Sequence, residues 1–348
     1  MAYRFSILAL LAAAGPSMVQ AAVPSVNGFT LAWSDDFEGG AGSLPKAENW
    51  IFTTGTQYPN GAANFGTGEI QTYTKDPKNV QLDGKGNVKI TAIKNGNAWT
   101  SARIETQRKD FVAPVGGKSK SGSTPYRITI HETSLTFLPR CLVRIQASLS
   151  TPKVAQPLGY WPAFWTLGAA FRGVYTNWPI VGEFDILENV NGEDKVYATL
   201  HCGTAPGGPC NENEGIGGSK TGCPNGPCPA NFHTYALEVD RSAGEGREKM
   251  TWFVDDVQYH QILPGKVEAS AWKEAVTKPH FLLMNLAIGG AFPNKGGKTT
   301  PVADTTSGGV FSAAYVAVYY STGAGNATTH AAPARGGKGG KLGAKYFS

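Results

Sequence analysis

Three carboxylates lie within six residues of a segment that otherwise has the pattern of a buried β-strand. Residues 183–188 read EFDILE, which places Glu183, Asp185 and Glu188 among large apolar side chains. Side chains at i and i+2 of a strand share a face, so Glu183 and Asp185 point the same way. Glu188 joins them only if one extra residue near Ile186 forms a β-bulge. Because burying an unpaired charge is costly, such acids indicate a function.

Carboxylates at this spacing suit the hydrolysis of glycosidic bonds. A retaining glycosidase uses one carboxylate as nucleophile and a second, protonated carboxyl as general acid, with their oxygens about 5 Å apart. A third acid between them raises the pKa of its neighbours by like-charge coupling. The alternative is a strand whose acids face solvent. The flanking aromatic residues argue against it, because Trp161, Trp165 and Trp178 lie within the 22 residues before Glu183.

Segments along most of the chain resemble glycoside hydrolase family 16. Residues 182–188 (GEFDILE) are similar to its E-x-D-x-x-E signature, in the bulged form of the laminarinase-like endo-1,3(4)-β-glucanases, including secreted fungal members. Further similar segments follow in the family's order: residues 33–39 (WSDDFEG), 68–74 (GEIQTYT), 161–165 (WPAFW), 232–235 (FHTY) and 285–290 (NLAIGG). The resemblance implies that Glu183 is the nucleophile, Glu188 the acid/base and Asp185 an assisting carboxylate.

Two departures from the family's pattern bear on the sugar that is recognised. Residues 139–146 read PRCLVRIQ, where the family often has G-R-x-E-A-R-I-K, so Leu142 stands in place of an acid. Thr67 and Gly68 replace paired asparagines before Glu69. These changes keep open a β-1,3-galactan substrate, or transglycosylation of wall glucan, with the same catalytic residues.

Aromatic and polar residues near the acids are the candidates for sugar binding. Sugar rings present C–H groups that pack on aromatic faces, and we expect Trp161 and Trp178 to line a cleft. His201 alternates with Thr199 and Tyr197 on the polar face of a neighbouring strand, and the family has a similar segment. We expect its imidazole to hydrogen-bond the acids or the sugar.

Two further candidates are ambiguous from the sequence. Asn285 interrupts an apolar run, so it is either a satisfied core amide or a groove residue. Glu69 and Gln71 share a strand face and could reach a sugar hydroxyl, or they could lie on a solvated edge.

The ends of the chain predict a secreted protein. Residues 1–21 combine Arg4, an apolar stretch too short to cross a bilayer and small residues at a cleavage site, which is the pattern of a signal peptide. We expect a catalytic domain over residues 22–322 and a disordered Gly/Lys-rich tail over 323–348. The predicted partner is a polysaccharide, with no membrane association, and the protein is expected to be an extracellular monomer.

Charge and cysteine content narrow the function further. The net charge of +5 comes from Arg4 and four basic residues of the tail, so the core is neutral and a nucleic-acid partner is not expected. Two disulfides are expected among Cys202, Cys210, Cys223 and Cys228, with three pairings open, and Cys141 is expected to be a buried free thiol. We assign no cofactor and no metal ligand. A structural calcium ion, which related sandwiches sometimes hold, is left open.

The remaining pattern predicts an all-β fold. The chain has 44 glycines and 22 prolines, and short strand-like runs recur at residues 87–93, 126–130, 196–201 and 249–254. One short helix is expected over residues 267–276 and a hairpin turn over 254–257. The predicted fold is a β-jelly-roll sandwich of two antiparallel sheets with an open cleft on the concave face. The predicted function is retaining endo-hydrolysis of β-1,3- or mixed β-1,3/1,4-glucan. A non-catalytic glucan-binding module is the alternative of a different class.

Overall fold

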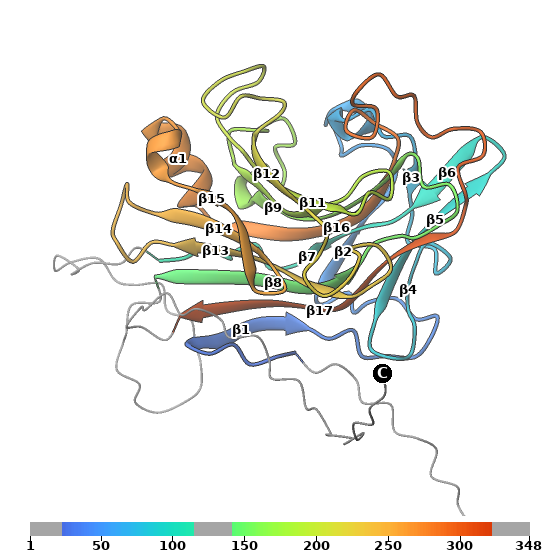
Figure 1. Ribbon diagram of the computed structural model, residues 1–348, viewed down its shortest axis with the longest axis horizontal. Coiled ribbons are helices and arrows are strands. Elements are labelled where there is room, and N and C mark those ends of the chain that lie inside the picture. Colours follow the sequence, from blue (N-terminus) through green and yellow to red (C-terminus); the bar gives the residue numbers. More distant parts are fainter. Residues whose placement is uncertain (1–22, 115–140, 322–348) are drawn as a thin grey trace, which may run out of the picture.

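Two stacked sheets make up the molecule, as seen in the computed structural model, which describes residues 23–114 and 141–321 (Figure 1). The larger sheet has the order β15-β14-β13-β8-β17-β5-β6-β3, with β1 beside β17 and β4 beside β5. Its strands are β1 (Phe29–Asp35), β3 (Thr72–Tyr73), β4 (Val80–Leu82), β5 (Val88–Asn95), β6 (Ala98–Ser101), β8 (Leu142–Ser150), β13 (His233–Asp240), β14 (Lys249–Val254), β15 (Val257–Ile262) and β17 (Gly309–Ser321).

The smaller sheet has the order β12-β11-β10-β9-β16-β7-β2 and carries the acidic strand at its centre. Its strands are β2 (Trp50–Thr53), β7 (Arg103–Thr106), β9 (Tyr160–Gly168), β10 (Glu183–Glu188), β11 (Lys195–His201), β12 (Ile216–Thr221) and β16 (His280–Ile288). The helical elements are η1 (Ala63–Gly66), η2 (Ala169–Phe171), η3 (Pro264–Lys266) and α1 (Ala269–Val276). The predicted all-β sandwich is confirmed, with one difference: β3 pairs with β6 in parallel.

Alternation along each strand places the core between the sheets. Phe184 and Ile186 of β10 are buried with Trp252 of β14 and Val316 of β17, in one continuous apolar cluster. The opposite, outer face of the smaller sheet carries the polar residues of β10 and β11. Figure 1 shows the segment around η1 and the connection from β16 to β17 rising on that outer side.

Helix α1 packs against the start of the acidic strand. Its buried side chains include Trp272 and Ala275. Gly182, which directly precedes β10, has φ +80°, and a Cβ there would lie 2.7 Å from the Cα of Ala275. Only glycine fits this contact, which fixes where β10 begins. The helix and the hairpin turn before Val257 were both predicted; Asp255 and Asp256 adopt positive φ in that turn.

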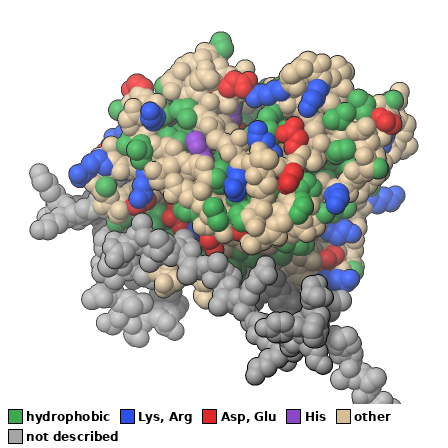
Figure 2. Space-filling model, in the orientation of Figure 1, with side chains coloured by type: hydrophobic (Ala, Val, Ile, Leu, Met, Phe, Trp, Pro, Cys, Tyr) green, Lys and Arg blue, Asp and Glu red, His purple; other side chains and the backbone are tan. Residues whose placement is uncertain are grey.

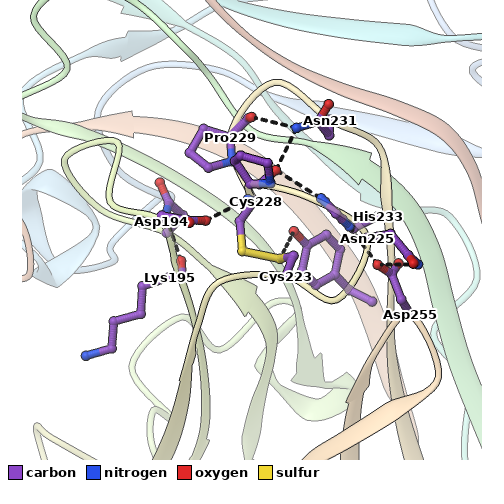
Figure 3. The surroundings of a disulfide bond; sticks show 12 residues. Asp194, Lys195, Cys223, Asn225, Cys228, Pro229, Asn231, His233 and Asp255 are labelled. Atoms are coloured by element: carbon purple, nitrogen blue, oxygen red, sulfur yellow. Dashed lines mark hydrogen bonds and ion pairs between the residues drawn. A yellow bond between two sulfur atoms is a disulfide. The ribbon is translucent and has the colours of Figure 1, made fainter. Parts of the chain in front are cut away.

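The two disulfides resolve the open pairing. Cys202 bonds Cys210, and Cys223 bonds Cys228, while Cys141 is buried and belongs to neither disulfide. Figure 3 shows the second disulfide beside Asp194, whose carboxylate accepts a hydrogen bond from the backbone N–H of Cys228. The bridge therefore ties this loop to the turn between β10 and β11.

The remaining predictions concern the charge on the surface, membrane association and the two ends of the chain. Figure 2 shows acidic and basic side chains interspersed over the face in view. Within the described ranges no helix is long and apolar enough to cross a membrane. The predicted signal peptide, the tail and the strand at 126–130 lie outside the described residues and stay predictions.

Candidate active site

A β-bulge brings the third carboxylate onto the acidic face. Opposite β9, Asp185 pairs with Trp165, whereas the next pair is Leu187 with Phe164, so one residue is inserted at Ile186. The same shift appears against β11 between Asp185 and Glu188. The predicted bulge is confirmed, and Glu188 lies on the side of Glu183 and Asp185.

A residue of the larger sheet supports this bulge from the core side. The indole N–H of Trp252 donates a 2.8 Å hydrogen bond to the backbone carbonyl of Asp185. Trp252 is fully buried in the core. A bulge removes ladder partners from the backbone, and an unpaired buried carbonyl is costly. The indole satisfies this carbonyl and couples the acidic strand to the core.

Each terminal glutamate of the array accepts a hydrogen bond from a predicted cleft tryptophan. Trp178 Nε1 donates to Glu183 Oε2 at 3.0 Å, and Trp161 Nε1 donates to Glu188 Oε1 at 2.8 Å. Both tryptophans are partly exposed. They therefore lie beside the acids, at opposite ends of the array.

Burial and like charge raise the pKa of both glutamates. Desolvation is the main cause for Glu188, followed by the charge of Asp185, and together they raise its pKa to about 8. The same two causes raise the pKa of Glu183 well above its ordinary value. The array therefore retains a proton near neutral pH, as acid catalysis requires. Since both pKa values rise, the two roles are assigned from motif order.

His201 supplies positive charge to the array. It pairs across the strands with Glu183, and its Nε2 lies 3.4 Å from Asp185 Oδ2. Its Nδ1 lies 2.7 Å from Glu212 Oε2. Burial alone lowers the pKa of His201, but the carboxylates of Asp185 and Glu212 outweigh that effect and raise it well above its ordinary value. The predicted contact of His201 with the acids is thus present.

A hollow of about 430 Å³ lies on the outer face next to Glu188. Tyr197, which pairs with Glu188 across the strands, forms part of its floor. Phe292 and Lys295, from the connection between β16 and β17, form part of its wall. Phe292 also contacts the ring of Trp161 edge-on at 5.8 Å. Glu183, Asp185 and Glu188 are not among its lining residues, so the hollow adjoins the acids only through Tyr197, the strand partner of Glu188.

A second charged network lies on the same face, at β7. Glu105 accepts hydrogen bonds from Thr53 Oγ1 at 2.6 Å and from Arg172 at 3.2 Å, and the Tyr58 hydroxyl also donates to it. Arg103 donates to the Tyr58 hydroxyl at 2.7 Å, and its guanidinium carbon lies 4.8 Å from the Trp165 ring centroid. This network fixes one side of the face.

The two ambiguous candidates are buried and bonded. Asn285 accepts from the Trp165 indole at 2.7 Å and donates to the Tyr73 hydroxyl at 3.1 Å, so it is a satisfied amide on the outer face. Glu69 is 4 % exposed and accepts from Gln71 at 3.0 Å. Of the two alternatives left open for Glu69, the solvated edge is excluded, because β3 is limited to two residues and Glu69 forms an isolated bridge with Gly289; a contact of Glu69 with the sugar stays a prediction.

In the part of the chain that the structure describes, one group of side chains has metal-ligand geometry. The ligand atoms of Glu183, Asp185 and His201 lie within 4.8 Å of one another. They are the acid array itself, and His201 faces carboxylates on both sides. Asp35, a buried acid at the end of β1, accepts hydrogen bonds from the Phe37 backbone and the Trp50 indole. It therefore has a structural role.

Sequence reasoning missed Glu212 and the network at β7. Glu212 lies in a Gly/Pro/Asn-rich loop, where no periodicity marks a buried acid. Arg103 and Glu105 did carry a signal, because they alternate with Ala102 and Ile104 as the acids of β10 alternate with apolar residues. That pattern could have indicated a polar network on the same face.

Comparisons with known proteins agree with this geometry. A model described as the XgeA-like, catalytic GH16 domain matches residues 84–224. The crystal structure of endo-1,3-β-glucanase from Streptomyces sioyaensis is 42 % identical, with a TM-score of 0.76, over 86 % of this chain and 99 % of that one. The endo-β-1,3-glucanase of Pyrococcus furiosus is 27 % identical, with a TM-score of 0.63, over 85 % and 96 % of the two chains.

Curated relatives include longer proteins. Clotting factor G alpha subunit of Tachypleus tridentatus is 30 % identical over 76 % of this chain, and glucan endo-1,3-β-glucosidase A1 of Niallia circulans is 28 % identical over 85 %. The matches span only 30 % and 38 % of those two proteins. β-Glucanase of Rhodothermus marinus, 28 % identical, is matched over 77 % of this chain and 78 % of its own length.

Proposed function

The chain belongs to glycoside hydrolase family 16, and on that premise we propose that it is a retaining endo-β-glucanase acting on β-1,3- or mixed β-1,3/1,4-glucan. The observation that carries the proposal is the bulged strand β10, which gathers Glu183, Asp185 and Glu188 on the outer face of the smaller sheet. The similarity to a solved endo-1,3-β-glucanase supports the β-1,3 linkage. Action outside the cell rests on the predicted signal peptide.

The reaction proceeds by double displacement. Ionised Glu183 attacks the anomeric carbon while Glu188 donates its proton to the leaving glycosidic oxygen. The bond to the leaving sugar breaks, and a glycosyl ester forms on Glu183. Glu188, now a carboxylate, takes a proton from water, which attacks the same carbon and releases Glu183. Two inversions give net retention.

The neighbours of the two glutamates support these roles. The Trp178 indole donates to Glu183, which stabilises its ionised form, and the positive His201 lowers the pKa of Glu183 against the effect of burial. Asp185 lies between the two glutamates and keeps negative charge beside Glu188, so that this residue holds its proton. Trp161 and Trp178 present their rings at the two ends of the array, where glucose units would stack.

A digestion panel tests the proposal. Purified protein is incubated with laminarin, mixed-linkage glucan, β-1,3-galactan, xyloglucan and agarose, and products are analysed by chromatography, with Glu183→Gln as the matched blank. We expect a ladder of oligosaccharides from laminarin that is absent in the variant. The anomeric proton of the first products, followed by NMR, should show the β configuration.

Other results would change the assignment in defined ways. Products from galactan alone would keep the mechanism and replace the substrate. Longer oligosaccharides than those supplied would indicate transglycosylation. Binding without any product, in wild type as in the variant, would identify a glucan-binding module and refute the hydrolase.

A further inference from the structure

Glu212 contacts the active site from a loop outside the acidic motif. Its side chain is fully buried, with 0 % exposure, although the loop lies at the surface between β11 and β12. Oε2 lies 2.7 Å from Nδ1 of His201, and Oε1 accepts a 2.8 Å hydrogen bond from the backbone N–H of Cys202. A buried carboxylate needs such partners, because its charge cannot be solvated by water.

Both ring nitrogens of His201 face carboxylates. Nδ1 faces Glu212 and Nε2 lies 3.4 Å from Asp185 Oδ2. A neutral imidazole carries one N–H, so only the imidazolium form directs a proton at each acid. The other groups around the ring are Glu183, opposite on β10, and the Trp178 ring, with centroids 5.6 Å apart. The ring is thus a cation enclosed by acids.

The loop is shaped to hold Glu212 against this ring. The Cys202–Cys210 disulfide closes the segment directly before Glu212. On its other side, Gly215 has φ +71°, and a Cβ there would lie 2.9 Å from His201 Cε1 and 2.4 Å from Thr199 Cγ2. Glycine therefore lets the backbone pack directly on the imidazole. These features restrict both the acid and the ring.

We propose that Glu212 is a positioning residue that keeps His201 in its imidazolium form, so that a fixed positive charge holds Glu183 ionised for attack. The inference rests on the proposed role of Glu183 and deepens it. The electrostatics of the ring agree with this proposal. Burial lowers the pKa of His201, but the carboxylates of Asp185 and Glu212 raise it above its ordinary value. The charge of His201 in turn lowers the pKa of Glu183 and of Glu188.

Glu212→Gln removes the charge and keeps the size of the side chain. His201 then loses one of its two anionic partners, and its titration moves down toward the ordinary value of about 6.5. Above that pH the ring is neutral, so Glu183 loses the positive charge that lowers its pKa and ionises only at higher pH. We therefore expect the acid limb of kcat/KM, which reports ionisation of Glu183, to move up by about one pH unit or more.

The experiment compares pH profiles of kcat/KM on laminarin, from pH 4 to 9, for wild type and Glu212→Gln. The matched control is Asp255→Asn, which removes the carboxylate 2.7 Å from Nδ1 of the remote His233, shown in Figure 3. We expect the control profile to follow wild type. A uniform loss of activity in Glu212→Gln, with unmoved limbs, would overturn the proposal and leave Glu212 a structural support.

A second variant separates charge from fit. Glu212→Asp keeps the charge and shortens the side chain, so the proposal predicts a profile closer to wild type than that of Glu212→Gln. The reverse order would contradict it. Comparison of the two variants remains decisive if both lower stability.

A spectroscopic readout separates this inference from the proposed function. The ¹³Cε1 shift of His201, assigned with His201→Gln, should remain that of an imidazolium well above the ordinary pKa of histidine in wild type and titrate at lower pH in Glu212→Gln. Equal titration in both would refute the inference even in an active enzyme. A wild type inactive on all glucans would refute the proposed function, while this titration would still decide the role of Glu212.

Discussion

The outer face of the smaller sheet carries two charged networks that differ in their balance of charge. At β10 the carboxylates of Glu183, Asp185 and Glu188 share one nearby histidine, itself bound to a further acid, Glu212. The network at β7 has a more even balance, because Arg103 and Arg172 both pair with Glu105 and the charge of the buried Glu69 also acts on Arg103.

This difference in charge distinguishes the network proposed to carry out the reaction from the network that supports the fold. Burial, followed by the negative charge of Asp185, raises the pKa of Glu188 to about 8, which suits proton transfer near neutral pH. The β7 carboxylate of Glu105 is paired with two arginines and accepts hydrogen bonds at both oxygens, which suits a structural role. Similar residues, equally buried on one sheet, thus serve different purposes according to charge balance.

The largest expected effect is that of Glu183→Gln on catalysis. Loss of the proposed nucleophile should lower kcat on laminarin by about 10⁴-fold, because the amide cannot form the glycosyl ester. The melting temperature should remain equal or rise, since one buried like charge is removed. Steady-state kinetics and calorimetry measure both quantities.

The matched control for that variant is Glu105→Gln, the same chemical change on the same face. Here kcat should stay within about tenfold, while the free energy of unfolding falls by about 1–3 kcal/mol as hydrogen bonds to a charged acceptor weaken. If Glu105→Gln lowered kcat as much as Glu183→Gln, the proposal that only the β10 network takes part in the reaction would be contradicted.

Arg103→Met should have the largest effect on stability. Arg103 is 4 % exposed and Glu105 is 3 % exposed, so removing the arginine leaves a buried acid short of one cation. We expect a loss of about 3 kcal/mol in the free energy of unfolding, measured by urea denaturation. Adding Glu105→Gln to this variant should restore part of the loss. A loss that grows further in the double variant would show that the pair does not act as a unit.

Glu188→Gln should change how stability depends on pH. In wild type the folded state holds the Glu188 proton up to about pH 8, whereas the unfolded chain releases it near 4.5. The folded state thus binds more protons in that window, and stability falls as pH rises through it. The variant lacks this decline, so its advantage should grow from pH 5 to 8, to a size on the order of a few kcal/mol. Parallel stability curves would contradict the raised pKa.

The smallest expected effect is that of Trp161→Phe. Its indole hydrogen bond lowers the pKa of Glu188 against the stronger effects of burial and Asp185. Without that bond the basic limb of kcat/KM should move upward by a fraction of a pH unit. Trp165→Phe is the control, because the Trp165 indole donates its hydrogen bond to Asn285 and not to Glu188. A downward shift of the basic limb in Trp161→Phe would contradict the claim that the indole hydrogen bond lowers the pKa of Glu188.

The acids of β10 could be predicted from the sequence because they alternate with apolar residues in the pattern of a strand. Alternation of acids with Phe184 and Ile186 required one inserted residue, and the register shows that residue where it was expected. Trp252, which holds the bulge from the other sheet, is 67 residues from Asp185, and such contacts depend on tertiary packing.

Glu212 marks the limit of that reasoning. A residue in an irregular loop has no periodic neighbours, so its burial follows only from the path of the chain, which the disulfide and Gly215 set. The pairing of cysteines was open for the same reason. At Glu69 the opposite happened, because the sequence pattern was interpreted as a regular strand. The chain there makes only an isolated bridge to Gly289.

Azide rescue tests the central claim most directly, namely that Glu183 is the nucleophile and Glu188 the acid/base. Glu183→Ala and Glu188→Ala are each incubated with an activated aryl β-1,3-glucoside and sodium azide, and the products are identified by NMR. The account predicts an α-glycosyl azide from Glu183→Ala, by a single inversion, and a β-glycosyl azide from Glu188→Ala, by attack on the glycosyl enzyme. The opposite pair of anomers would exchange the two roles and contradict the account.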